Sequence, residues 1–289
     1  MMFNLILTVK KCILLFVSIG LMIFMGLSYF TYPQISPGCP IPKSTKNNNF
    51  YSQYLEDYIL SILFKGVKKG HYIDVGANDP DHDSVTKYFY LKGWRGINIE
   101  PIHKQYLKLM TYRPEDQNFN IGIAEQSKNL LLSVIYRNDK DIDNDGLSTF
   151  DPAVLKQAIQ DGLSYKSVTV SVKPLNEILQ AHPLQPIHFI KIDVEGMEDE
   201  VLKSIDLTKY RPWAFIIEAT EPRTFIRSDE KWKNTLLQNN YIEVMFDGLN
   251  AYYIAKEHQD ALHQQLTKAY DCASEVNEKF HIINNKITH

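Results

Sequence analysis

"HYIDVGANDP", residues 71–80, is the stretch of sequence that decides the fold. Residues 72–75 are apolar apart from Asp74, which is typical of a buried parallel strand, and the strand stops at Gly76. Only this one glycine follows, whereas a loop that binds a dinucleotide pyrophosphate carries the pattern G-x-G-x-x-G. The acidic residues within 79–83 would also repel phosphate groups. The sequence therefore predicts a strand end that approaches a ligand without phosphates.

From residue 50 onward, helix-like and strand-like segments alternate along the chain. Strands that alternate with helices predict a mostly parallel sheet with helices on both faces. The two runs around Asp247 and Gly248 predict a closing β-hairpin, which adds an antiparallel strand at one edge. The predicted helices are 52–64, 83–93, 103–112 and 197–205, and the predicted strands are 71–75, 95–100, 120–125, 129–136, 187–193, 212–218 and a pair within 241–257.

Acidic residues stand at the ends of four predicted strands: Asp74, Glu100, Asp193 with Glu195, and Glu218. In open α/β sheets, ligands bind outside the carboxyl ends of the strands. Any one of these side chains could simply be solvated, but acidic residues are rare in buried strands unless something uses them. Their recurrence at corresponding strand ends indicates a binding edge.

Glu100 ends the strand that follows Gly76 along the chain. A carboxylate at this place can accept two hydrogen bonds from the hydroxyls of a ribose. A ribose, no phosphates and an acidic lining suit a nucleoside with a positive charge. S-adenosylmethionine has this chemistry, since it combines adenosine, a sulfonium and an amino group.

Six segments together resemble the FkbM family of S-adenosylmethionine-dependent methyltransferases. They are "SQYLEDYIL", "YIDVGAND", "GWRGINIEP", "GLSTF", "FIKIDVEGMEDEVL" and "IIEAT", in this order within residues 50–257. The resemblance implies a class I methyltransferase-like, Rossmann-like fold: a three-layer α/β sandwich around a seven-stranded sheet whose last strand is reversed. It also implies methyl transfer, commonly to an oxygen of a sugar or a natural product.

The resemblance also assigns residues to the cofactor. By position, Asp74, Gly76 and Asn78 would line the methionine and sulfonium side of S-adenosylmethionine, and Glu100 would hold its ribose. The family's D-V-E-G-x-E signature corresponds to the segment that contains Asp193, and it is expected near the methyl acceptor.

A neutral hydroxyl acceptor must lose its proton, so a general base is expected near this signature. The candidates are Glu195, Asp193 and Glu218, and Glu195 is favoured because it follows a strand end directly. Asp193 could instead anchor the loop or hold a divalent metal. Glu195 and Glu198 could instead only cap the helix that follows, because acidic residues in a first turn stabilise the helix dipole.

No metal ligand is assigned from the sequence. The segment "DIDNDG", residues 141–146, matches the first half of a calcium-binding loop. Its twelfth position should be a glutamate that binds with both oxygens, but Pro152 stands there. A solvated acidic turn is the favoured interpretation.

The composition limits the other classes of function. A net charge of −3 gives no basic field for nucleic acid, so no nucleic-acid partner is expected. Three cysteines, of which Cys12 lies in an apolar run, exclude a disulfide framework. A single bridge between Cys39 and Cys272 remains open.

The N-terminal part predicts a membrane anchor. Residues 12–30 carry no charge and are near the roughly 20 residues that a spanning helix needs, after a short segment 1–11. A cleaved signal peptide is the alternative, but its apolar run is usually shorter and ends at a small-residue cleavage site. The proline- and asparagine-rich stretch 31–49 reads as an extended linker. Basic residues stand on both sides of the anchor, so the side of the membrane that the domain faces stays open.

Residues 258–289 lie beyond the resemblance and predict a helical tail. Apolar residues from Leu262 to Phe280 follow a heptad spacing. A helix packed back on the domain is favoured over a dimer zipper, because the pattern is short for a coiled coil. The oligomeric state is left open.

The sequence thus predicts a single-pass, membrane-anchored methyltransferase that acts on a hydroxyl of a glycan, a lipid-linked sugar or a similar small acceptor. Two alternatives remain: another nucleotide- or dinucleotide-using α/β enzyme, and a non-catalytic, membrane-tethered binding module of the same fold.

Overall fold

The structure is a computed structural model that describes residues 50–137, 147–222, 224 and 226–276. The predicted segments 1–11, 12–30 and 31–49 lie outside the described residues, as does the acidic turn 141–146. The anchor therefore stays a prediction. Over the described part of the chain, no helix combines the length and the apolar character needed to cross a membrane.

Seven strands form the main sheet, in the order β3-β2-β1-β7-β8-β10-β9. Strands β3, β2, β1, β7 and β8 pair in parallel, whereas β10 runs antiparallel to both β8 and β9. The predicted parallel sheet and its closing hairpin are therefore confirmed. The strands are β1 (His71–Val75), β2 (Arg95–Ile99), β3 (Gln117–Phe119), β7 (Phe189–Ile192), β8 (Ala214–Glu218), β9 (Tyr241–Phe246) and β10 (Asn250–Ala255).

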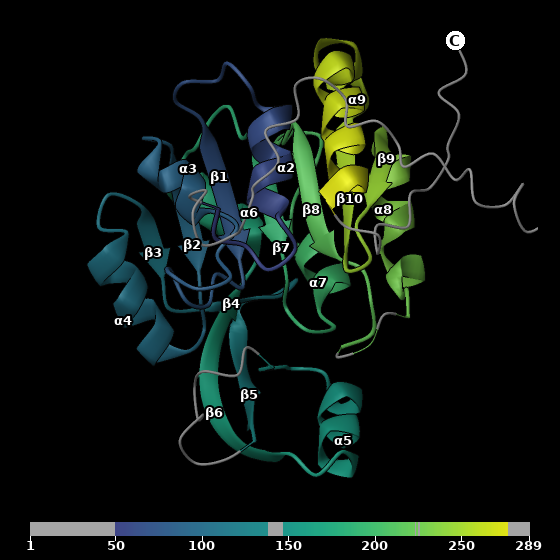
Figure 1. The fold of residues 1–289 in the computed structure, drawn as a ribbon. Coiled ribbons are helices and arrows are strands. Elements are labelled where there is room, and N and C mark those ends of the chain that lie inside the picture. The colour runs from purple at the N-terminus through teal and green to yellow at the C-terminus, as the bar shows by residue number, and fades with distance from the viewer. Residues whose placement is uncertain (1–49, 138–146, 223, 225, 277–289) are drawn as a thin grey trace, which may run out of the picture. The chain divides into compact units, whose positions relative to one another are not determined.

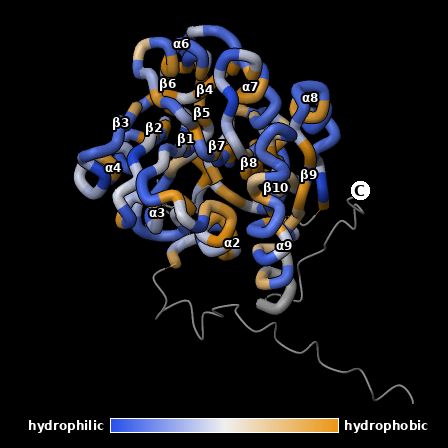
Figure 2. Tube along the Cα trace, turned by 90° about the horizontal axis from the view of Figure 1, so that it is seen from above, coloured by the Kyte–Doolittle hydropathy of each residue, from blue (hydrophilic) through white to orange (hydrophobic). Residues whose placement is uncertain are grey.

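Helices cover both faces of this sheet, so the fold is a three-layer α/β sandwich (Figure 2). One face carries α2 (Glu56–Leu63), α3 (Lys87–Leu91) and α9 (Gln259–Val276), and the other carries α6 (Leu175–Ala181), α7 (Glu198–Lys203) and α8 (Lys233–Gln238). Helix α4 (His103–Tyr112) contacts the edge strand β3. Two short 3₁₀ turns, η1 (Asp229–Lys231) and η2 (Lys256–His258), precede α8 and α9.

The central strands are buried on both faces, which explains their continuous apolar runs. On one face, Ile73, Ile190 and Ile217 belong to a core that α6, α7 and α8 complete. On the other face the core is aromatic, and the ring of Phe189 lies 5.0 Å from the ring of Phe89 at their centroids. The two different cores fix which face each helix covers.

A second, three-stranded sheet departs from the prediction. Its order is β4-β6-β5, with β4 (Gly122–Ile123), β5 (Lys128–Tyr136) and β6 (Ser164–Lys173), and α5 (Pro152–Gln160) lies between β5 and β6 in the chain. In Figure 1 it extends beyond the carboxyl ends of β7 and β8. The sequence analysis does not predict β6 and does not separate β4 and β5 from the main sheet. In β6, Val168, Val170 and Val172 alternate with serine and threonine, which is the pattern of a half-buried strand and was overlooked because it contains no continuous apolar run.

The C-terminal helix α9 packs against α2, which is the packing back on the domain that the tail's apolar spacing predicts. Its described buried side chains are Leu262, Ala269 and Cys272. Cys272 is also disulfide-bonded. Cys12 and Cys39 lie outside the described residues, so the Cys39–Cys272 pairing stays an open alternative and not a prediction.

Candidate functional site

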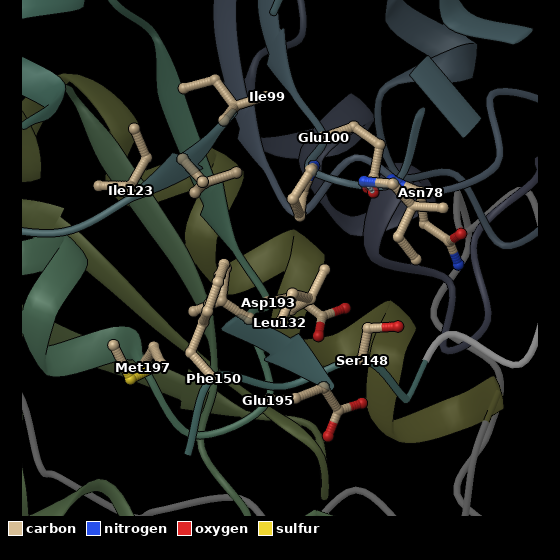
Figure 3. A pocket seen from close by; sticks show the side chains of 16 residues that line it. Asn78, Ile99, Glu100, Ile123, Leu132, Ser148, Phe150, Asp193, Glu195 and Met197 are labelled. Carbon is tan, nitrogen blue, oxygen red and sulfur yellow. Dashed lines mark hydrogen bonds between the residues drawn. The ribbon is translucent and has the colours of Figure 1, made fainter. Parts of the chain in front are cut away.

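A pocket lies at the carboxyl ends of β1, β2 and β7, on the side of the second sheet. Figure 3 shows the carboxylates of Asp193 and Glu195 on one side of it, and Phe150 and Met197 on the other. The lining is therefore mostly apolar, with its acidic residues gathered at particular strand ends. It consists of Val75, Gly76 and Asn78 after β1, Ile99 to Ile102 at the end of β2, Gly122, Ile123, Leu132, Ser148 and Phe150 from the second sheet and its loop, and Asp193, Val194, Glu195 and Met197 after β7.

Gly76 lines this pocket in a conformation that only glycine adopts readily. Its φ is +78°, in the left-handed region. A Cβ atom at this position would lie 1.9 Å from the backbone oxygen of Asp193. The glycine therefore lets the loop after β1 pass close to the loop after β7. This contact within the protein is a reason for the glycine that the sequence analysis did not foresee, besides the approach of a ligand.

Glu100 is buried at the end of β2 and joins the two loops that follow β1 and β2. Its Oε2 accepts a hydrogen bond from the backbone N–H of Asn78 at 2.8 Å, and its Oε1 accepts one from the N–H of Ile102 at 2.7 Å. Burial raises the pKa of Glu100 to about 7, against the effect of these two hydrogen bonds. A carboxylate has about four acceptor positions, so each oxygen can still accept a hydrogen bond from a ligand.

Asp74 lies behind the pocket and does not line it. Its Oδ2 accepts a hydrogen bond from Thr86 Oγ1 at 2.7 Å, and its Oδ1 lies 3.5 Å from Lys191 Nζ. Lys191 also donates to the backbone oxygen of Gly76 at 2.7 Å and lies 3.2 Å from Asp193 Oδ2. Burial acts to lower the pKa of Lys191, but attraction to Asp193 and Asp74 outweighs it and raises that pKa above its ordinary value.

Lys191 is a site residue that was not predicted, although the sequence carries a signal for it. A lysine in the middle of the apolar run "FIKID" is out of place in a buried strand unless acidic residues neutralise it. The structure shows that it links the loops after β1 and β7 through Gly76 and Asp193.

Asp193, Glu195 and Glu218 come together at the ends of β7 and β8. Each offers one carboxylate oxygen, and these oxygens all lie within 4.8 Å of one another. Asp193 and Glu195 line the pocket, whereas Glu218 is buried next to them and does not line it. Burial and then repulsion from the carboxylates of Asp193 and Glu195 raise the pKa of Glu218 well above its ordinary value.

The turn between Asp193 and α7 holds Glu195 in a left-handed conformation with φ of +52°. Such a conformation is uncommon for a residue other than glycine and costs of the order of 1–3 kcal/mol. Two contacts fix it. Thr149 Oγ1 donates to the backbone oxygen of Glu195 at 2.7 Å, and Glu198 Oε1 accepts from the N–H of Gly196 at 3.1 Å. The strained residue is therefore held by its neighbours.

Glu198 and Glu195 thus have different places in the structure. Glu198 begins α7, and its buried carboxylate bonds to the backbone of the preceding turn, as a helix-capping residue does. Burial raises the pKa of Glu198 to about 7. Glu195 lies before the helix and lines the pocket. The capping alternative therefore describes Glu198 and leaves the carboxylate of Glu195 at the pocket.

The acid-rich loop after Gly76 is less negative than its sequence suggests. Asp79 Oδ2 lies 2.6 Å from Lys108 Nζ, and Asp81 forms an ion pair with Lys87. Although burial acts to raise it, the pKa of Asp79 is lowered to about 2 by its hydrogen bonds to Lys108 and to the loop backbone. Neutralisation by lysines weakens the argument that this loop alone repels phosphate.

Of the seven predicted site residues, five line one pocket, and they come from three separate strand ends. These are Gly76, Asn78, Glu100, Asp193 and Glu195. Asp74 and Glu218 adjoin the pocket without lining it. The loop before α5 supplies Ser148 and Phe150, which belong to the segment "GLSTF" of the family resemblance but received no individual role from the sequence. The pocket thus joins three strand ends and has acidic residues at one side.

Residues 74–243 match the model of the methyltransferase FkbM domain. The match includes every predicted site residue and covers more than half of the 289-residue chain. It is narrower than the region 50–257 in which the sequence resemblance was seen. A comparison with curated proteins finds none that matches this chain. The sheet, the pocket and this match agree, and the chain belongs to the FkbM methyltransferase family.

Proposed function

We propose that this chain transfers a methyl group from S-adenosylmethionine to a hydroxyl oxygen of a carbohydrate or a similar small acceptor. Membership in a methyltransferase family implies a methyl donor of this kind. The observation that carries the proposal is that Glu100, at the end of β2, lines the same pocket as Asp193 and Glu195, at the end of β7. A binding carboxylate and two candidate bases thus adjoin one space.

The residues of the β1–β2 side fit the chemistry of S-adenosylmethionine. Glu100 can accept hydrogen bonds from ribose hydroxyls, because its backbone contacts leave acceptor positions on both oxygens. Gly76 and Asn78 are the residues expected beside the methionine part. Of the described residues that line the pocket, none is a lysine or an arginine, which suits a ligand without phosphates. When bound, the donor supplies an activated methyl group on a sulfonium.

The residues of the β7–β8 side fit the acceptor. In the proposed reaction, the acceptor hydroxyl gives its proton to Glu195, and its oxygen forms a bond to the methyl carbon. The electrons of the carbon–sulfur bond return to sulfur, which becomes a neutral thioether. Positioning of the hydroxyl supplies most of the rate in such a displacement, and proton removal typically adds roughly 10²–10⁴-fold. The apolar side chains of Phe150 and Met197 can contact the carbon skeleton of the acceptor.

We also retain the proposal that residues 12–30 anchor the protein to a membrane as a single-pass helix. The absence of charge over this stretch supports it. An anchored domain would meet lipid-linked sugars readily. A reporter that is active on only one side of the membrane can be fused to the C-terminus. Its activity gives the side on which the domain lies.

The proposal is tested by calorimetry of the full chain with S-adenosylhomocysteine, the product of the donor. The variant is Glu100→Gln rather than Glu100→Ala, because glutamine keeps one oxygen for the loop backbone. We expect the wild type to bind S-adenosylhomocysteine. The affinity should fall at least about tenfold in Glu100→Gln, because a hydrogen bond to a charged group contributes roughly 1.5–3 kcal/mol. Glu125→Gln, on the exposed surface after β4, is the control and should bind as wild type does.

A thermal-shift experiment separates this proposal from the alternative of another nucleotide- or dinucleotide-using α/β enzyme. S-adenosylhomocysteine should raise the melting temperature. If NAD or a nucleotide sugar raised it while S-adenosylhomocysteine had no effect, the donor assignment would be overturned.

A further inference from the structure

We propose that Asp193, Glu195 and Glu218 bind one divalent cation beside the acceptor side of the pocket. This inference rests on the proposed function for its role in the reaction, but the binding itself does not need donor or acceptor. One carboxylate oxygen from each residue lies within 4.8 Å of the other two. Three oxygens at such separations can contact a common ion without large movement of the backbone.

The second observation is the burial of Glu218 without a hydrogen-bond partner. Its exposed fraction is 9%, so it is nine-tenths buried. Among the described residues, no donor forms a hydrogen bond with its carboxylate, and one of its oxygens lies within 4.8 Å of an oxygen from each of the other two acidic residues. A largely buried carboxylate beside two others has a need for positive charge if it is to stay ionised. A cation shared with Asp193 and Glu195 would satisfy it.

Glu100, the other strand-end glutamate, shows by contrast what a satisfied carboxylate looks like. Both of its oxygens accept hydrogen bonds from backbone N–H groups. Among the three proposed ligands, Asp193 faces Lys191 through Oδ2 at 3.2 Å. Lys191 contributes one positive charge to a neighbourhood that also contains the buried carboxyl group of Asp74. The local charge therefore stays negative even with Lys191 present. A divalent cation can neutralise more of it than one further singly charged side chain could.

Oxygen ligands alone point to the class of ion. Carboxylates suit Mg²⁺, Mn²⁺ and Ca²⁺, whereas zinc and copper sites usually include histidine or cysteine. Three protein oxygens would leave coordination positions for water or for an acceptor hydroxyl. Because Asp193 and Glu195 line the pocket, these positions would face it. A hydroxyl bound there would lose its proton more readily, and the oxygen of Glu195 that does not bind the ion could accept that proton.

The experiment is a titration of the full chain with MnCl₂, in which electron paramagnetic resonance measures the free ion, without S-adenosylmethionine or any acceptor. We expect one saturable Mn²⁺ site per chain that MgCl₂ or CaCl₂ displaces. Even outer partners of a metal change its affinity by roughly 10–100-fold, so Glu218→Gln should weaken binding at least about tenfold. Glu125→Gln, an exposed acidic residue of the same type, should leave the affinity unchanged.

Asp193→Asn is the second variant and should weaken Mn²⁺ binding by a similar factor. Binding of S-adenosylhomocysteine to both variants, measured in metal-free buffer, verifies that they are folded and tests the donor pocket separately. The proposal is overturned if the wild type has no saturable Mn²⁺ site, or if either variant binds Mn²⁺ as tightly as the wild type. Loss of S-adenosylhomocysteine binding in the wild type would instead contradict the proposed function.

Discussion

Both halves of the sheet's carboxyl edge carry acidic residues at strand ends, but the contacts of these residues differ between the two halves. In the β1–β2 half, Glu100 bonds to the backbone of both neighbouring loops. In the β7–β8 half, Asp193, Glu195 and Glu218 face one another across less than 5 Å, and Glu218 accepts no hydrogen bond from the described residues. Acidic residues at strand ends therefore do not all have the same function. The function of each depends on whether the backbone already uses its oxygens.

The difference indicates a division of labour. Hydrogen bonds to the backbone fix the β1–β2 loops, which suits a surface that must bind the same donor in every turnover. Carboxylates that repel one another are costly to keep, and proteins usually retain such groups where chemistry needs them. The comparison can be broken or sharpened by substitutions on either side.

The largest effect is expected on the rate of methyl transfer in Glu195→Gln. If Glu195 accepts the proton of the acceptor hydroxyl, the rate should fall roughly 10²–10⁴-fold. Affinity for S-adenosylhomocysteine should stay within about twofold, because the donor half is untouched. Transfer of radiolabelled methyl groups to a panel of sugars and glycosides measures the rate, with Glu125→Gln as the control. If Glu195→Gln lowered the affinity for S-adenosylhomocysteine as much as the rate, the β1–β2 and β7–β8 halves would not have separate functions.

The next largest effect is expected on stability in Gly76→Ala. A left-handed conformation alone costs an alanine roughly 1–2 kcal/mol. The matched control is Gly162→Ala, because Gly162 has φ of +80° and nothing within 4 Å of the position of a Cβ. The contact with Asp193 should therefore add a further cost of roughly 1–3 kcal/mol at Gly76. Urea denaturation of both variants gives the difference. Equal free energies of unfolding would show that the two loops do not need their close approach.

A smaller effect separates Glu100 from Glu218. Glu100→Ala removes the acceptor of two backbone N–H groups and should lower the free energy of unfolding by roughly 1.5–3 kcal/mol. Glu218→Gln removes no hydrogen bond between described residues, so stability should change little or rise. Chemical denaturation in metal-free buffer measures both. If Glu218→Gln proved as destabilising as Glu100→Ala, the two halves would be alike after all.

The smallest effect is a slope with pH. The ordinary pKa of a glutamate is 4.5, and burial raises that of Glu100 to about 7. Between these pH values the folded state binds more protons than the unfolded state, so the free energy of unfolding should fall as pH rises. Glu56 and Asp57, whose pKa values burial raises to about 7 and about 6, act in the same direction.

Glu100→Gln should remove part of this slope, up to about 1.4 kcal/mol per pH unit for one group. Denaturation curves measured between about pH 5 and pH 7 provide the test. A stability that rises over this range in the wild type would contradict the burial of these groups as the cause.

The main sheet could be predicted from the sequence because its strands are buried on both faces. Runs such as "FIKI" and "AFIIE" leave few other structures, and the turn signal Asp247–Gly248 predicts the hairpin. The second sheet was not predicted because β6 has alternating valines in place of a continuous apolar run, and because its pairing with β5 depends on residues far apart in the chain. The spacing of apolar residues predicts which face of a strand is buried, but it does not predict which other strand it pairs with.

The site was predictable in its residue types and less so in their partners. Five of the predicted residues line one pocket, because parallel strands bring their carboxyl ends to one edge. Hydrogen bonds from backbone N–H groups to Glu100 leave no pattern in the sequence. Glu56 likewise reads as an ordinary exposed residue in a first helical turn. It is buried, and Asn250, nearly two hundred residues further along, donates a hydrogen bond to it.

The short strand β4 has a consequence for how this enzyme could diversify. Gly122 and Ile123 pair with Val172 and Lys173, so the chain leaves the central domain and re-enters it at adjacent points. The described residues between these points, including Ser148 and Phe150, pair with none of the seven strands of the main sheet, so the register of that sheet does not depend on their number; the contact of Thr149 with Glu195 does depend on them. If the proposed function holds, changes in this one segment would alter acceptor preference while the strands that form the donor side stay the same.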